Sequence, residues 1–192
     1  ALWWAGDGGK QDSKEAARLF GLSCATGELV ACAALGSLYQ AGDGVPQDAA
    51  KAVGYLEKAC TTTVPDGCYN LGQLVRQGLG TSADPARAAT LYRRACEGGD
   101  PAGCGWLGLM HAEGAGVAAD PARAARLFVQ ACDGGWIEGC FNAGVADAKG
   151  DGVPRDNARA GQAFQRACKG GVERACQVLD RQRAKRGKRA KA

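Results

Sequence analysis

The chain has 192 residues, of which 46% are hydrophobic and 23% are charged, and its formal net charge is +4. No run of 18 apolar residues occurs, so the sequence predicts no membrane-spanning helix. Residues 180–192 hold seven Lys or Arg and one Asp, a net charge of +6, which leaves the rest of the chain at −2. The basic character therefore belongs to the C-terminal tail alone. No signal peptide is visible in the sequence. Because the chain begins with Ala1 and not with Met, the absence of a signal peptide says little about export.

The ten cysteines occur in five pairs, and the spacing of these pairs organises the whole chain. Seven residues separate the two cysteines of a pair, and each pair begins 36 residues after the previous one. The pairs are Cys24 and Cys32, Cys60 and Cys68, Cys96 and Cys104, Cys132 and Cys140, and Cys168 and Cys176. A fixed period of this length is typical of a repeat array, in which each unit packs against its neighbours.

The first residues match the end of a helix. Residues 1–5 correspond by the period to residues 37–41, so we expect the chain to begin in the middle of a repeat. Trp3 and Trp4 would then be apolar surface exposed by this truncation. The alternative is that they form a real N-terminal cap or a surface for a partner.

A full unit can be followed through the second repeat. Apolar residues at helical spacing predict a first helix over residues 31–41. Gly42 and Gly44 mark its end, where Gly adopts a left-handed conformation at low cost. Asp48 is expected to cap a second helix, which runs to about Cys60. The equivalent aspartates of the other repeats are Asp12, Asp84, Asp120 and Asp156.

The two helices of a unit are expected to pack closely. The second helix carries an inward stripe of apolar residues, such as Ala52 and Leu56, at spacings of three and four. A glycine recurs in the first helix and would let the neighbouring helix approach; it is Gly36, Gly72, Gly108 and Gly144. A final polar helix is expected from about residue 172 to 185, as the end of a solenoid requires.

The cysteine pairs favour disulfides. Cys60 ends one predicted helix and Cys68 lies in the first turn of the next, where the two can face each other within disulfide distance. Five identical spacings make pairing within each pair the economical connectivity, although the sequence leaves other connectivities open. Structural zinc fits poorly, because the cysteines are eight positions apart and the chain has one His. Buried free thiols are the other alternative. Disulfides would imply an oxidising compartment.

The repeat resembles a known family. The unit GC-x-x-LG-x-x-Y-x-x-G-x-GV-x-x-D-x-x-x-A-x-x-L-[YF]-x-x-AC resembles the Sel-like repeat, a relative of the tetratricopeptide repeat. The added cysteine pair is similar to the Helicobacter cysteine-rich protein family, which ACEGGDPAGC, ACDGGWIEGC and GCFNAG match at several fixed offsets. The resemblance covers residues 1–179 and leaves 180–192 as a basic tail. It implies an all-α, right-handed superhelix of 36-residue helix pairs, with disulfides linking consecutive helices, in a secreted or periplasmic protein.

The resemblance implies two classes of function. Members of the family have been described as penicillin-binding proteins or β-lactamases, whereas such repeats more generally are adaptors that bind proteins or peptides. No S-x-x-K, SDN or KTG motif of a serine β-lactamase occurs. His111 is the only His and is expected to be a plain helix residue, because the other repeats do not keep it; they have Tyr39, Val75 and Asp147. We therefore expect a non-enzymatic scaffold without metal or cofactor that binds a protein or peptide. The alternative is an unusual β-lactam-binding protein or β-lactamase-like hydrolase.

The binding site is expected on the first helices, which the resemblance places along the inner, concave groove. One stripe of each first helix is fixed by packing, and the opposite stripe is free to vary. The variable stripe supplies the candidate binding residues Tyr69, Asn70, Gln73, Arg76, Trp106, Leu109, Phe141 and Asn142, and continues with Glu113, Val145 and Lys149.

Three of these candidates, Asn70, Trp106 and Asn142, share one register and would form a ladder along the groove. The amides could bind a peptide backbone or its terminal carboxylate, and Trp106 could be an apolar anchor. The alternative is that the two Asn bond within their own helices and that Trp106 fills a gap between repeats.

The basic tail, residues 181–192, carries no aromatic side chain for base stacking. We expect a solvated helix end that frays. The alternative is electrostatic attachment to an anionic surface, such as lipid head groups or an acidic partner. Nucleic acid is not an expected partner, because an oxidised protein would seldom meet DNA.

Overall fold

A computed structural model describes residues 10–189 of the chain, with side chains for residues 12–184. Ten α-helices make up this part of the chain, which contains no strand beyond one isolated bridge between Thr61 and Val64. The predicted all-α class is therefore confirmed. The expectations for residues 1–5, including Trp3 and Trp4, lie outside the described residues.

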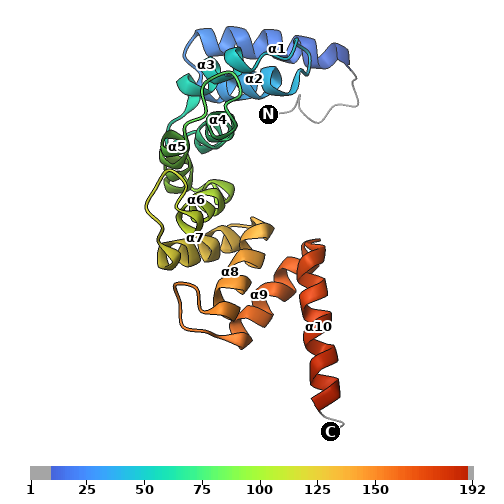
Figure 1. The fold of residues 1–192 in the computed structure, drawn as a ribbon. Coiled ribbons are helices and arrows are strands. Elements are labelled where there is room, and N and C mark those ends of the chain that lie inside the picture. Colours follow the sequence, from blue (N-terminus) through green and yellow to red (C-terminus); the bar gives the residue numbers. More distant parts are fainter. Residues whose placement is uncertain (1–9, 190–192) are drawn as a thin grey trace. The chain divides into compact units, whose positions relative to one another are not determined.

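The helices belong to two compact units, Ala1–Asp100 and Pro101–Ala192, and each is described by itself. The first unit holds α1 (Lys10–Ala25), α2 (Leu29–Ala41), α3 (Ala49–Ala59), α4 (Pro65–Gln77) and α5 (Pro85–Glu97) (Figure 1). Each helix packs against the next one along the chain. The hairpins α2–α3 and α4–α5 are successive repeats, each with a first and a second helix.

The second unit holds α6 (Pro101–Glu113), α7 (Pro121–Asp133), α8 (Ile137–Lys149), α9 (Asn157–Lys169) and α10 (Glu173–Arg189). The hairpins α6–α7 and α8–α9 repeat the pattern, and α10 packs on α9 as a final first helix. This last helix continues about four residues beyond its predicted end. None of the described helices is long and apolar enough to cross a membrane.

Glycines end the first helices as predicted. Gly42 follows α2 with φ of 74°, in the left-handed region, and its N–H donates to the carbonyl oxygen of Leu38. The second glycine of the turn has another role as well. A Cβ on Gly44 would collide with the backbone of Ser13, and one on Gly80 with the backbone of Ala49. The turn of each of these repeats therefore lies directly on the second helix of the preceding repeat.

Aspartates cap four second helices. Asp48 Oδ1 accepts a hydrogen bond of 2.9 Å from the backbone N–H of Lys51, and the equivalents Asp84, Asp120 and Asp156 bind their helices in the same way. The prediction was wrong for Asp12, because α1 begins two residues earlier, at Lys10. Asp12 lies instead in the first turn, where the positive end of the helix dipole tolerates a carboxylate.

The recurring glycine of the first helix gives each hairpin its core contact. A Cβ on Gly72 would stand 2.7 Å from the ring of Tyr92, and one on Gly108 would stand 2.8 Å from the ring of Phe128. The side chains of Leu56 and Phe164 fill the same place opposite Gly36 and Gly144. Burial in this contact raises the pKa of Tyr92 to about 12. The predicted close approach of the two helices is therefore confirmed.

Disulfides join the end of a second helix to the start of the next first helix. Within the units, Cys24 pairs with Cys32, Cys60 with Cys68, Cys132 with Cys140 and Cys168 with Cys176, with Cα atoms 4.3–4.9 Å apart. Cys96 and Cys104 are disulfide-bonded as well, and the described chain has no free cysteine. The predicted pairing is confirmed in these four cases, and the alternative of buried free thiols is wrong.

Candidate binding faces of the first helices

The candidate residues all lie on first helices, and all are partly buried. Tyr69, Asn70, Gln73 and Arg76 are on α4, Trp106 and Leu109 are on α6, and Phe141 and Asn142 are on α8. The α4 residues belong to the first unit and the other four to the second. The ladder that would join Asn70 to Trp106 and Asn142 therefore stays a prediction, and each unit offers its own face.

The face of α4 is a network of side-chain hydrogen bonds. Gln73 Nε2 donates to the hydroxyl of Tyr69 at 3.1 Å, and Arg76 Nη2 donates to Gln73 Oε1 at 3.3 Å. Asn70 Nδ2 donates to Ser37 Oγ of α2 at 3.2 Å, so this amide bonds across repeats and not within its own helix. The bond uses one of the amide's two N–H donors. The network holds three of the four polar side chains in a row along the helix.

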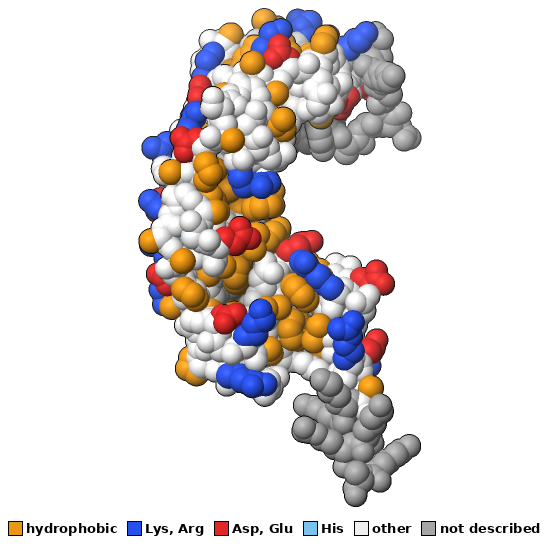
Figure 2. Space-filling view, in the orientation of Figure 1, with side chains coloured by type: hydrophobic (Ala, Val, Ile, Leu, Met, Phe, Trp, Pro, Cys, Tyr) orange, Lys and Arg blue, Asp and Glu red, His pale blue; other side chains and the backbone are white. Residues whose placement is uncertain are grey.

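The second unit contains an open groove between α6 and α8, with α7 beneath it. Its volume is about 420 Å³. The groove is lined by Leu109, Ala112, Pro121, Ala124, Ala125, Phe128, Asn142, Val145, Ala146, Lys149 and Asp151. Figure 2 shows hydrophobic side chains of this unit gathered on one face, with charged side chains around them. The groove therefore combines an apolar floor with a few polar groups.

The structure brings some of the predicted residues into this groove and not others. Leu109 and Asn142 line it, together with Val145 and Lys149 from the same variable stripe. Phe141 lies elsewhere: its ring centroid is 5.7 Å from that of Phe164, and the guanidinium of Arg174 lies 4.2 Å above it. Trp106 is half-buried on α6 and does not line the groove.

Lys149 and Asp151 stand at one end of the groove. Their charged atoms are 3.9 Å apart, and both side chains are more than 60% exposed. Because both side chains are this exposed, the ion pair contributes little to stability. For the same reason, both charges are accessible to a ligand. Asp151 and the floor residues Ala124 and Phe128 were not predicted from the sequence as part of a binding site. The repeat register offered a signal for the floor, since it places Phe128 opposite Gly108.

His111 is a buried helix residue, with 6% of its surface exposed. Its Nδ1 lies 3.3 Å from the carbonyl oxygen of Ala118. No hydrogen-bond partner lies near its Nε2 among the described residues. The ring thus faces the turn after α6 and is separate from the groove, whose lining does not include it.

The sequence matches the model of the Sel1 repeat family five times, over residues 3–27, 29–61, 65–100, 101–136 and 137–172. These matches cover most of the chain. No protein with a curated description matches the chain significantly.

Several solved structures are similar. One is a protective antigen present in uropathogenic Escherichia coli strains that displays an SLR fold, with a TM-score of 0.79 at 31% identity, over 83% of this chain and 34% of that one. Another is a Sel1 repeat protein from Oxalobacter formigenes, with a TM-score of 0.79 at 29% identity, over 86% of this chain and 66% of that one. The chain thus spans about a third of the first protein and just under two thirds of the second. A third is Helicobacter pylori cysteine rich protein B, with a TM-score of 0.53 at 30% identity, over 67% of this chain and 92% of that one.

Proposed function

Because the chain belongs to the Sel1 repeat family, we propose that it is a disulfide-stapled scaffold that binds an extended peptide or protein segment along its first helices. The observation that carries this proposal is the groove between the first helices α6 and α8, where an apolar floor formed by α7 lies beside polar groups. Sites of this kind bind mainly through apolar contacts, with a few polar groups that fix orientation.

The groove has chemistry that suits a polypeptide. The amide of Asn142 can both donate to and accept from a peptide backbone. Leu109 and Val145 offer apolar contact for alternate side chains of an extended segment, and Phe128 lies beneath them. Lys149 at the end of the groove can pair with a terminal carboxylate or an acidic side chain of the ligand. The first unit would add Tyr69, Asn70, Gln73 and Arg76 as a second, polar contact face.

The disulfides support an oxidising location for this scaffold, the periplasm or the cell exterior. Thiol-reducing systems keep disulfides rare in the cytosol, and every described cysteine here is paired. The basic tail, residues 181–192, would add electrostatic attachment to an anionic surface.

The experiment is a selection of peptides from a random library on the oxidised protein, followed by affinity measurements with variants. Leu109→Ala and Asn142→Ala should each weaken a selected peptide about tenfold, because each removes a contact within the groove. The matched control is Ala158→Ser, on the exposed first turn of α9, which should change nothing. Peptides that bind both groove variants as tightly as the wild type would contradict the proposal.

The β-lactam alternative stays a prediction from the resemblance to the Helicobacter cysteine-rich family. Nitrocefin hydrolysis, measured with and without added metal ions, separates it from the scaffold. Turnover above background that survives repurification would favour the hydrolase.

A further inference from the structure

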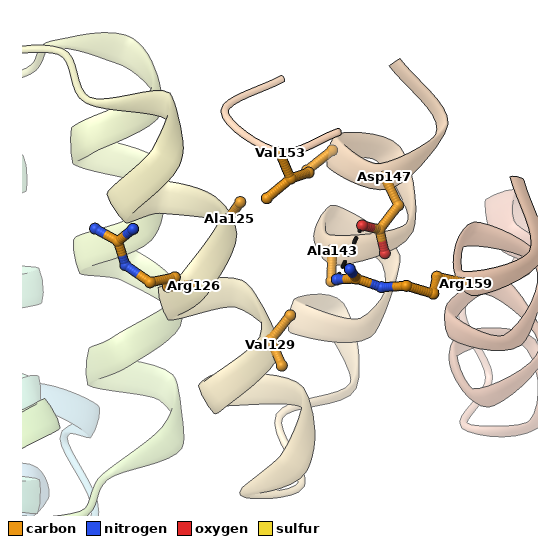
Figure 3. A pocket seen from close by; sticks show the side chains of 8 residues that line it. Ala125, Arg126, Val129, Ala143, Asp147, Val153 and Arg159 are labelled. Atoms are coloured by element: carbon orange, nitrogen blue, oxygen red, sulfur yellow. Dashed lines mark ion pairs between the residues drawn. The ribbon is translucent and has the colours of Figure 1, made fainter. Parts of the chain in front are cut away.

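A second cavity adjoins the peptide groove just described and shares Ala125 and Ala146 with it, but it opens between α8 and the start of α9. It has a volume of about 240 Å³ and is formed by α7, α8, the turn after α8 and the start of α9 (Figure 3). Its lining residues are Ala125, Arg126, Val129, Ala143, Ala146, Asp147, Val153 and Arg159. Most of the wall is thus apolar, and the volume suits a small molecule.

The cavity exists because α8 has small side chains where the other first helices have large ones. At the position of Ala143, the equivalent helices carry Leu35, Leu71 and Leu107. At the position of Ala146, they carry Leu38, Leu74 and Met110. All six of these larger side chains are buried in their own repeats. Packed interiors keep few voids larger than a water molecule. The replacement of two large side chains by Ala143 and Ala146 therefore leaves space that a ligand can fill.

A buried acid replaces an apolar or aromatic residue at the edge of the same cavity. Asp147 stands where the other repeats have Tyr39, Val75 and His111, and it is 5% exposed. Its Oδ1 lies 3.1 Å from Arg159 Nη2, and the Arg159 side chain is 54% exposed. In Figure 3 this ion pair forms one wall of the cavity, facing Ala125 and Val129, while the guanidinium of Arg126 points away. The wall therefore presents a carboxylate and a guanidinium side by side.

Both partners of the ion pair can make further interactions with a ligand. The guanidinium has five N–H donors in a planar fork that suits a carboxylate. Burial raises the pKa of Asp147, which the Arg159 charge only partly offsets. A second cation at this carboxylate would therefore be favourable. Since the pair is neutral as a whole, the matching ligand is one that carries both charges and is itself neutral.

We propose that this cavity binds a small apolar α-amino acid as its zwitterion. Asp147 receives the ammonium group, Arg159 receives the carboxylate, and the space left by Ala143 and Ala146 receives the side chain. An aliphatic side chain such as that of leucine or valine matches the wall formed by Val129 and Val153.

The test is isothermal titration calorimetry of the oxidised full chain with L-leucine, L-valine and two blocked analogues. Leucinamide lacks the carboxylate and N-acetylleucine lacks the ammonium group, so each should bind at least tenfold more weakly than L-leucine. The proposal is overturned if either analogue binds as tightly as L-leucine, or if neither L-leucine nor L-valine binds.

Three variants test whether leucine binds in this cavity or elsewhere on the surface. Ala143→Leu restores the side chain of the other repeats, and it should abolish leucine binding while the melting temperature stays the same or rises. Asp147→Asn keeps the shape but removes the charge, and it should weaken L-leucine at least tenfold. Ala112→Trp, on the α6 side of the peptide groove and outside the lining of this cavity, is the control and should leave leucine binding unchanged. Leucine binding that persists in folded Ala143→Leu overturns the assignment to this cavity.

Discussion

The contact between a first-helix glycine and the side chain opposite it can be tested by adding a single methyl group. Gly144 lies in α8, and a Cβ there would stand 2.8 and 2.9 Å from two ring atoms of Phe164. That ring is 2% exposed, so it cannot yield without disturbing the core. Gly161 lies in the partner helix α9, and a Cβ there would meet nothing within 4 Å. The two glycines are therefore a matched pair within one repeat.

The Gly144→Ala substitution has two effects of opposite sign on the free energy of unfolding. Replacing a helical Gly by Ala stabilises by about 1 kcal/mol from backbone propensity at either position. Overpacking at Gly144 costs about 1–3 kcal/mol, whereas Gly161→Ala carries no such cost. Gly161→Ala should therefore raise the free energy of unfolding by about 1 kcal/mol, and Gly144→Ala should lie about 1–3 kcal/mol below it.

Urea unfolding of the oxidised protein, followed by far-ultraviolet circular dichroism, measures both variants. Because the propensity gain is common to both, the difference between them isolates the packing cost. If the two variants are equally stable, the ring of Phe164 accommodates the methyl group and the glycine is not required for the close approach.

Three further predictions concern the disulfides, the buried acid and the tail. Reduction should lower the melting temperature markedly, because each disulfide contributes about 2.5 kcal/mol in the chain-entropy model; an unchanged melting curve with confirmed reduction would refute this. Burial raises the pKa of Asp147, with Arg159 opposing and Asp156 adding to the rise, so the folded state binds this proton at higher pH than the unfolded state. The wild type should therefore gain stability relative to Asp147→Asn as the pH falls through the raised pKa towards the usual value of about 3.9, which pH-dependent urea unfolding measures; parallel pH profiles would contradict it. Deleting residues 181–192 should abolish any low-salt binding to anionic vesicles in a sedimentation assay, and binding that persists would place that site elsewhere.

The sequence was sufficient for the features that repeat. The 36-residue period placed the turns, the four aspartate caps, the cysteine pairs and the glycine contacts, because each depends on local chemistry recurring at a fixed offset. The predicted cap at Asp12 is wrong because the helix there begins at Lys10, earlier than the repeat register requires.

Contacts between different repeats were beyond this reasoning. Asn70 bonds to Ser37 of the preceding repeat, and the guanidinium of Arg174, on the following helix α10, lies over the ring of Phe141. These contacts depend on how far each side chain reaches across a helix interface, which the sequence spacing does not specify. The cavity at Asp147 was not predicted, because the replacement of two large side chains by Ala143 and Ala146 forms a cavity only through the packing of α7 and α9 around α8.

The central claim, that a peptide binds in the groove between α6 and α8, is tested most directly by blocking the groove. Ala112 is exposed on α6 and lines it, so Ala112→Trp places a large ring in the path of the ligand without entering the core. The affinity of a library-selected peptide for this variant, measured by fluorescence anisotropy, should fall at least tenfold at an unchanged melting temperature. Undiminished affinity in the folded variant would contradict the account.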